Sequence, residues 1–217
     1  KRGEAAYDFF DKHLFKPFAR AMSDMANAQV NMMNDFKQLK KDLNIPKKLR
    51  KDNSSGFTNE NSVRIAIWNQ MGYDIPGISK TDLKEIVDLV NADPELKLFA
   101  DEVIRVNKGE YMQPGQDWLG GTITTDLIAG LNKIKRKDYL SEWKQNVDLI
   151  FSEKNMNKLE AALGPKYVEA LRNTLQRMET GSNRLYSNSR LANRALDYLN
   201  NAQGVVMFLN MRSALLQ

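Results

Sequence analysis

The sequence predicts an all-α protein, and three observations support this prediction. Apolar residues recur at steps of three and four along most of the 217-residue chain, which is the spacing of amphipathic helices. Glycine, proline and capping residues interrupt these stripes at intervals typical of short helices. Alternating apolar and polar runs bounded by turns, which indicate strands, are not found. We therefore expect an irregular bundle of about nine or ten helices with a long N-terminal helical arm.

The composition excludes several kinds of chemistry. The 42% of hydrophobic residues is enough to bury a full core, and the net charge of +5 is modest. The chain has no cysteine, which excludes disulfides, thiolate metal sites and cysteine nucleophiles. Its single histidine, His13, lies in an aromatic helical stretch, and we interpret it as structural. No apolar run reaches the roughly 20 residues of a membrane span, so no transmembrane span is predicted.

The first element is predicted to be one long helix over residues 3–43. Pro17 either kinks this helix or starts a second one at its first turn. Beyond Pro17 the apolar side chains alternate steps of three and four, the seam of a coiled coil or of a long bundle helix. In one interpretation the seam packs on its own domain. In the other it is an adaptable surface for a partner protein or a second copy. The seam residues that would form this interface include Met22, Met25, Met32 and Phe36.

A basic segment at residues 40–51 follows, and then a polar stretch at 53–56. We interpret the two as a linker, with a first domain over residues 1–52. The cations either solvate a hinge or contact phosphates of a nucleic acid. Because no aromatic residues interleave with them, the signal for nucleic acid is weak. The cations in question are Lys47, Lys48, Arg50 and Lys51.

From residue 61 onward, short helices with marked ends are expected to form a bundle, the predicted second domain over 53–181. Ser79 is followed three residues later by Asp82, a near relative of a capping box. Asp93 and Pro94 supply the N-cap and first residue of the next helix. The residues after this turn are acidic, which excludes a helix-turn-helix DNA reader because its recognition helix needs a basic face.

Residues 109–125 form the longest irregular segment, and loops of this length often carry function. We expect Trp118 to anchor the loop in the core and Thr124 or Thr125 to cap the next helix. The alternative is the pocket of an enzyme, and its residues would be Tyr111, Asp117, Trp118 and Asp126. The sequence contains no catalytic constellation, metal-ligand set or cofactor motif, so neither an enzyme nor a cofactor is predicted.

Further stripes predict helices over residues 127–134, 139–150, 159–163 and 168–178. A charged junction at 133–137 separates the first two, and Ser152 and Asn155 are candidate caps of the third. Gly164 and Pro165 separate the last two helices, and Gly181 ends the final one.

Residues 182–217 form the predicted third segment. It begins with arginines and becomes a helix that is apolar nearly all the way round from residue 202, so another surface must cover it. No capping residue closes this helix, and we expect the natural polypeptide to continue. The residues of the predicted interface are Val205, Phe208, Leu209, Leu215 and Leu216. The candidate phosphate contacts are Arg184, Arg190 and Arg194, whose alternative role is pairing with carboxylates on a helix surface.

Several blocks of the chain resemble a helical region of large polyvalent proteins, which are very large proteins encoded by tailed bacteriophages. These blocks are 71–79 (MGYDIPGIS), 121–128 (GTITTDLI), 139–143 (YLSEW), 181–184 (GSNR) and 207–217 (MFLNMRSALLQ). The resemblance implies a segment of a multi-domain virion protein or of a protein delivered with the genome during DNA ejection. It implies a location in the virion interior or, after delivery, in the host cytoplasm. It brings no catalytic residues with it.

Three functional hypotheses follow. The first is a non-enzymatic helical scaffold or interaction segment whose partners are other parts of the same large protein, other virion proteins or further copies of itself. The alternative is a helical module that binds the phage genome weakly through the cations named above. The third is part of an enzyme with a site near the loop at 109–126.

Overall fold

The structure, a computed structural model, describes residues 2–107 and 111–181. These residues are predominantly helical and contain no strand beyond an isolated bridge between Asp52 and Thr58, which confirms the all-α class. The chain divides into two compact units, Lys1–Asp24 with Arg136–Gln217, and Met25–Lys135. Both boundaries fall inside helical segments, and the boundary that the sequence suggested after residue 52 lies within the second unit. The predicted apolar helix of residues 182–217 lies outside the described residues.

The helical backbone runs without a break from Arg2 to Asp42, and Pro17 lies in the first turn of its last part, directly after a wider turn. α1 (Arg2–Phe10) leads through a wide π-helical turn, η1 (Asp11–Phe15), into α2 (Lys16–Asp42). Within the wide turn the Lys16 N–H donates to the Asp11 carbonyl oxygen, five residues back. A proline has no N–H, and in an α-helix its ring clashes with the carbonyl four residues earlier, which is that of His13. The wide turn accommodates the ring. The Asn146 side-chain amide donates to the His13 carbonyl oxygen over 3.0 Å in place of the missing backbone donor.

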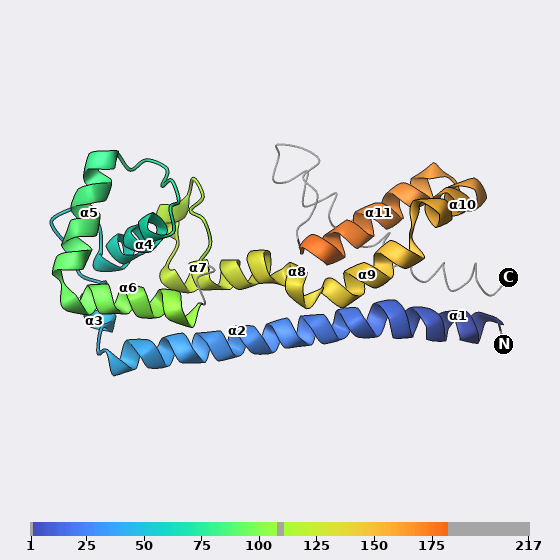
Figure 1. Ribbon diagram of the computed structural model, residues 1–217, viewed down its shortest axis with the longest axis horizontal. Helices are drawn as coiled ribbons and strands as arrows, with labels where there is room; N and C mark the ends of the chain where they lie inside the picture. The colour runs from blue at the N-terminus through green and yellow to red at the C-terminus, as the bar shows by residue number, and fades with distance from the viewer. Residues whose placement is uncertain (1, 108–110, 182–217) are drawn as a thin grey trace. The chain divides into compact units, whose positions relative to one another are not determined.

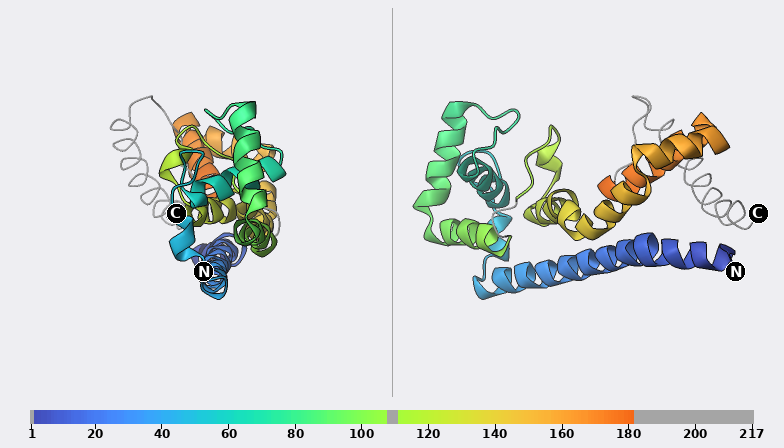
Figure 2. Two further views of the ribbon diagram at one scale, coloured as in Figure 1. Left: turned by 90° about the vertical axis from the view of Figure 1, so that its left-hand side faces the viewer. Right: turned by 45° about the vertical axis from the view of Figure 1, so that its right-hand side comes forward.

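The other described helices of this unit are α8 (Arg136–Tyr139), α9 (Ser141–Ile150), α10 (Glu153–Leu163) and α11 (Pro165–Thr180). α10 and α11 pack side by side (Figures 1 and 2), and their contact buries Met156, Val168 and Leu171. A second cluster joins the N-terminal helix to α9. Its buried residues are Leu14, Ala21, Leu140, Trp143 and Val147.

Gly181 ends α11, as predicted, and two observations explain the glycine. Its φ of 67° lies in the left-handed region that side chains disfavour. A Cβ at this position would also lie 2.9 Å from the Arg136 Cζ atom. The Arg136 guanidinium donates to the carbonyl oxygens of Met178 (2.8 Å) and Glu179 (3.0 Å). The end of α11 is therefore completed by a side chain of α8.

The second unit begins within α2. It continues with four helices, α3 (Pro46–Leu49), α4 (Asn59–Gln70), α5 (Lys80–Ala92) and α6 (Pro94–Val106). A short 3-10 turn, η2 (Trp118–Gly120), then leads to α7 (Ile123–Gly130) and to a π-helical turn, η3 (Leu131–Lys135). α4 packs against both α5 and α6, which meet at a sharp corner (Figures 1 and 2). The core between them is apolar and aromatic. Its most buried members include Phe36, Ile45, Val63, Ile65, Ile67, Trp68, Ile86, Val90, Leu96, Phe99, Val103, Tyr111, Ile123 and Leu127.

Two predicted helix starts in this unit are confirmed. The Ser79 hydroxyl accepts a hydrogen bond from the backbone N–H of Asp82 at the start of α5. The Asp93 carboxylate accepts from the N–H groups of Glu95 and Leu96 at the start of α6. These caps satisfy donors that a helix leaves unpaired at its first turn.

Two other predicted caps were assigned to the wrong residue or the wrong helix. Thr122, not Thr124 or Thr125, is the N-cap of α7, and the Thr125 hydroxyl accepts the Thr122 N–H in return. Ser152 occupies the N-cap position of α10 as predicted, but its side chain makes no cap bond there. The Asn155 amide instead donates to the Ile150 carbonyl oxygen at the end of the preceding helix, α9.

The predicted flexible linker at 53–56 is instead a hydrogen-bonded loop. The Asn53 N–H donates to the Phe57 carbonyl oxygen, and its side-chain amide donates to Asn59 (3.0 Å) and to Ser62 (2.8 Å). An asparagine that binds across its own turn holds the backbone in one conformation. The prediction failed because composition alone cannot distinguish such a loop from a hinge. In the described part of the chain, no helix combines the length and hydrophobicity that crossing a membrane requires.

Candidate functional site

The segment with the strongest charge is the end of α2 together with α3. Residues 37–51 contain seven lysine and arginine residues and one aspartate, a net charge of +6. The whole chain carries +5, so everything outside this segment carries −1 in total. The positive charge of the protein is therefore concentrated in one short part of the second unit. A local concentration of fixed charge raises the electrostatic potential where a partner would dock.

A tight turn joins α2 to α3 and fixes where these cations lie. Three backbone N–H groups donate to backbone carbonyl oxygens in this turn: Leu43 to Leu39, Asn44 to Lys41 (3.0 Å) and Ile45 to Lys40 (3.2 Å). Asn44 has a φ of 48°, in the left-handed region. Asparagine tolerates this conformation better than other residues with side chains. The turn joins the basic end of α2 directly to the basic helix α3.

Two buried side chains anchor α3. Ile45 is fully buried and Leu49 is 4% exposed, and both belong to the core of the second unit. Residues four apart lie on the same side of a helical turn, so the side chains at 47, 50 and 51 are directed away from this anchor. Lys47, Arg50 and Lys51 are exposed. The cations are therefore carried by a packed element and not by a solvated hinge.

Within residues 37–51, five exposed cations have no ion pair to a described residue, and we refer to them together as the basic surface. They are Lys37, Lys41, Lys47, Arg50 and Lys51. Three of them were singled out from the sequence. Lys37 and Lys41 were missed, although the charge count over 37–51 would have included them. Lys40, between them, is half-buried with its ammonium 4.5 Å from the centre of the Phe36 ring.

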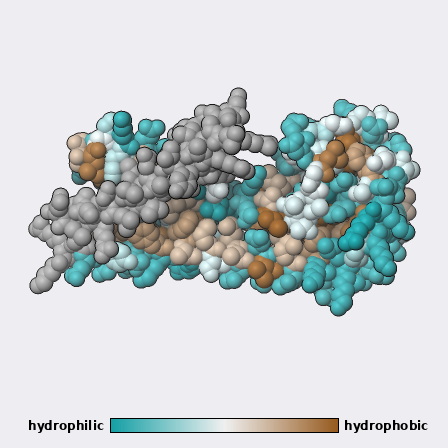
Figure 3. Space-filling model, turned by 180° about the vertical axis from the view of Figure 1, so that it is seen from behind, coloured by the Kyte–Doolittle hydropathy of each residue, from teal (hydrophilic) through white to brown (hydrophobic). Residues whose placement is uncertain are grey.

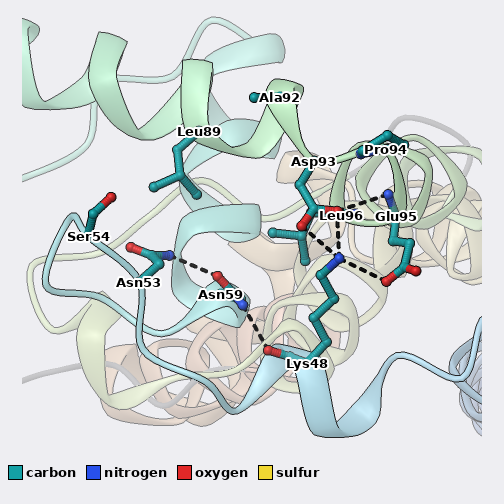
Figure 4. A pocket seen from close by; sticks show the side chains of 10 residues that line it. All are labelled: Lys48, Asn53, Ser54, Asn59, Leu89, Ala92, Asp93, Pro94, Glu95 and Leu96. Atoms are coloured by element: carbon teal, nitrogen blue, oxygen red, sulfur yellow. Dashed lines mark hydrogen bonds and ion pairs between the residues drawn. The ribbon is translucent and has the colours of Figure 1, made fainter.

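Lys48, the fourth basic residue predicted in this segment, does not belong to the basic surface. Its ammonium pairs with Asp93 (2.6 Å) and Glu95 (2.8 Å), as Figure 4 shows. Hydrogen bonds to Asp93 and Glu95 raise its pKa. These contacts connect α3 to the start of α6, so Lys48 positions the helix whose other lysine and arginine side chains face solvent.

An open pocket of about 570 Å³ lies beside Lys48 (Figure 4). The side chains of Lys48, Asn53 and Asn59 in its wall already bind neighbouring groups. The side-chain amide of Asn53 donates to the side-chain oxygen of Asn59. The side-chain amide of Asn59 donates in turn to the backbone carbonyl oxygen of Lys48 (2.9 Å). The pocket therefore presents little unused hydrogen-bonding capacity to a ligand.

The predicted methionine seam is partly buried. Phe36 is 1% exposed and packs on Phe99 with the ring centres 6.0 Å apart, inside its own unit. Met25 is buried, and Met22 and Met32 are half-buried. This placement of Phe36 is the one expected of a helix packed on its own domain. The other candidate interface residues, Val205, Phe208, Leu209, Leu215 and Leu216, lie outside the described residues, as do Arg184, Arg190 and Arg194.

The loop between α6 and α7 covers a buried polar network. Arg64 on α4 is 1% exposed, and its guanidinium donates to both carboxylate oxygens of Asp126, over 2.7 and 3.1 Å. It also donates to the Asn61 side chain (3.0 Å) and to the Gly121 carbonyl (2.8 Å). The buried Tyr111 hydroxyl donates to Asp126 over 2.7 Å. Burial, and then the charge of Asp126, raise the pKa of Tyr111 well above its ordinary value.

Two tryptophans enclose this network. Arg64 lies over the Trp68 ring at 4.8 Å and near the Trp118 ring at 5.7 Å. The indole N–H of Trp68 donates to the backbone carbonyl oxygen of Met112, and the indole N–H of Trp118 donates to that of Pro76. Both indole donors are therefore satisfied. Trp118 is 6% exposed, so it anchors the loop in the core as predicted. Of the residues proposed for an enzyme pocket, only Asp117 is exposed.

Arg64 was not singled out from the sequence, although a signal was present. It lies among Val63, Ile65, Ile67 and Trp68, so the middle of α4 is apolar around it. An arginine in such a helix must be buried, and a buried charge needs a partner. In the part of the chain that the structure describes, no group of histidine and carboxylate side chains is arranged to hold a metal ion.

Comparisons of this chain with protein-family models, with curated proteins and with solved structures find no match.

Proposed function

We propose that this chain is a non-enzymatic helical interaction module that binds a polyanionic partner through the basic surface. The observation that carries the proposal is that five exposed, unpaired cations lie on the end of α2 and along α3 and the residues after it, and that Ile45 and Leu49 anchor α3 in the core. Because the helix is already packed, little conformational freedom is lost when a partner binds. Long-range attraction between this surface and an anionic partner would also accelerate their association.

Two further observations support a binding role over a catalytic one. Under the loop at 111–122, Arg64, Asp126 and Tyr111 use their hydrogen-bonding groups on one another and on the backbone. The face of the second unit visible in Figure 3 is largely hydrophilic, with hydrophobic residues in small separate areas. A hydrophilic face suits an electrostatic contact better than a large apolar interface.

Retention on heparin–agarose tests the proposal. The full chain should bind the column and elute at elevated salt, because screening weakens contacts between exposed charges. The variant Lys47→Gln/Arg50→Gln/Lys51→Gln should elute at markedly lower salt. A matched control, Lys80→Gln/Lys84→Gln/Lys97→Gln, removes the same charge from exposed positions on α5 and α6. It should elute close to the unmodified protein. Equal shifts for the two variants, or no retention of the unmodified chain, would refute the proposal.

We also propose, on the resemblance to large polyvalent proteins, that the module is a segment of a large phage virion protein or of a protein delivered with the genome. Its location would be the virion interior or the host cytoplasm after delivery. Its further partners would be other parts of that protein, other virion proteins or a second copy, bound through residues 205–216. The complete open reading frame tests this context: neighbouring virion or ejection domains are expected, and neighbours typical of another class of protein would contradict it.

A further inference from the structure

We infer that the partner of the basic surface is double-stranded nucleic acid, bound at its phosphate backbone without recognition of base sequence. This inference rests on the proposed function and names the partner. It follows from the chemistry of the five side chains, from what surrounds them and from what the segment lacks.

The side chains of the basic surface suit phosphates better than base edges. Four of the five are lysines, which act as point charges, and only Arg50 has the planar fork that reads guanine. α3 has four residues, a single turn, whereas helices that read bases lie along the major groove over several turns. Contacts to phosphate fix a protein on nucleic acid but carry no sequence information.

The surroundings favour a duplex over a single strand. Proteins that bind single strands stack the bases on exposed aromatic side chains. No aromatic residue occurs between residues 37 and 56. The flanking aromatics are Phe36, which is 1% exposed, and Phe57, which is half-buried and packs on the Trp118 ring at 5.9 Å. A duplex keeps its bases stacked inside and offers only phosphates and grooves, so it needs no aromatic platform.

The segment also lacks the apolar contacts that a protein or membrane partner would need. The leucines and isoleucine among the cations, Leu39, Leu43, Ile45 and Leu49, are buried or half-buried against the core. A protein interface is expected to have an apolar centre, and a membrane-surface helix inserts apolar side chains. A duplex carries one charge per about 1.7 Å of its axis, so separated cations meet phosphates in any register.

The carboxylates nearby limit the size of the contact. Asp93 and Glu95 form ion pairs with Lys48, and their carboxylates would repel a phosphate on that side. The basic surface then neutralises at most five phosphates. The logarithm of the binding constant should fall against the logarithm of salt concentration with a slope no steeper than about −4.5.

Fluorescence anisotropy with a labelled duplex of about two helical turns tests the inference, using the full chain at salt between about 50 and 200 mM. Lys47→Gln/Arg50→Gln/Lys51→Gln should flatten the slope by about 2.7, which corresponds to three phosphate contacts. The Lys80→Gln/Lys84→Gln/Lys97→Gln control should keep the slope of the unmodified chain. A second duplex of equal length and different sequence should bind with the same affinity. A single strand of equal length should bind more weakly.

Other outcomes overturn the inference in distinguishable ways. Tighter binding of the single strand, or dependence on duplex sequence, would contradict backbone contact with a duplex. Retention on heparin without duplex binding would refute the inference and leave the proposed function standing. Binding to vesicles of anionic phospholipid without duplex binding would assign the surface to a membrane. A chain that binds neither heparin nor the duplex would refute both the proposed function and this inference.

Discussion

Arg64 shows how a single residue organises the second unit. Its guanidinium joins α4 to the Gly121 carbonyl and to Asp126 on α7, which are 57 and 62 residues away in sequence. A buried charge is tolerated only when paired and hydrogen-bonded, so Arg64 and Asp126 stabilise the fold only as a pair. The loop at 111–122 is held by this pair, by the Tyr111 hydroxyl and by Trp118.

Replacing Asp126 by asparagine should therefore destabilise the protein strongly. Asparagine keeps the shape but leaves the Arg64 charge uncompensated, and such losses are about 3–5 kcal/mol. The midpoint of urea unfolding should fall. The double variant Arg64→Met/Asp126→Asn should recover part of the loss, because no unpaired charge then remains.

Glu102→Gln is the control for this comparison, since it breaks the exposed pair between Arg105 and Glu102 on α6. Exposed pairs contribute little to stability, so its urea midpoint should stay near that of the unmodified protein. A similar small effect from Asp126→Asn, or strictly additive effects in the double variant, would show that the network is not a coupled unit.

At the scale of one element, the wide turn before Pro17 lets the helical backbone continue past a proline. A proline inside a helix usually kinks or ends it. Here the π-helical turn at Asp11–Phe15 and the side chain of Asn146 on α9 together satisfy the backbone around the proline. The continuity of α1 with α2 thus depends on a contact from a residue 133 positions away in sequence.

Removing the hydrogen bond from Asn146 to the His13 carbonyl oxygen should lower the stability of the protein only while Pro17 is present. Asn146→Leu leaves the His13 carbonyl oxygen without its partner, which should lower the free energy of unfolding by about 1–3 kcal/mol. In a Pro17→Ala background the backbone N–H of residue 17 can take over, so the same substitution should cost less. Urea unfolding of the unmodified chain, the two single variants and the double variant measures the cost of Asn146→Leu in each background. Gln145→Leu, at the exposed neighbouring position, serves as the control. An equal cost of Asn146→Leu in both backgrounds would contradict the explanation.

Helix ends that depend on local signals could be predicted from the sequence. Ser79, Asp93 with Pro94, and Gly181 cap or end their helices through residues at most four positions away. Helix ends that depend on distant residues could not. For Pro17 the sequence left open a kink or a new helix start, because the donor that compensates for the proline is on α9. The Arg136 contacts at the end of α11 also connect distant segments.

At the scale of the whole molecule, the distribution of charge is more informative than its sum. The net charge of +5 indicates only a weakly basic protein, yet residues 37–51 alone carry +6. The sequence showed a basic segment there but suggested a flexible hinge. The four-residue spacing of Ile45 and Leu49 around the helix-starting Pro46 was a signal for an anchored helix. That Lys48 is neutralised by Asp93 and Glu95 could not be foreseen, because these carboxylates belong to a later helix.

Hydrogen exchange of the full chain, measured with and without a saturating heparin oligosaccharide, tests the central claim most directly. The claim is that the basic surface binds a partner while the polar network under the loop is structural. Ligand contact slows amide exchange where it stabilises the backbone. We expect slower exchange within residues 37–51 and no change within residues 111–126. Slower exchange in 111–126, with 37–51 unchanged, would contradict the claim and locate the functional site under the loop.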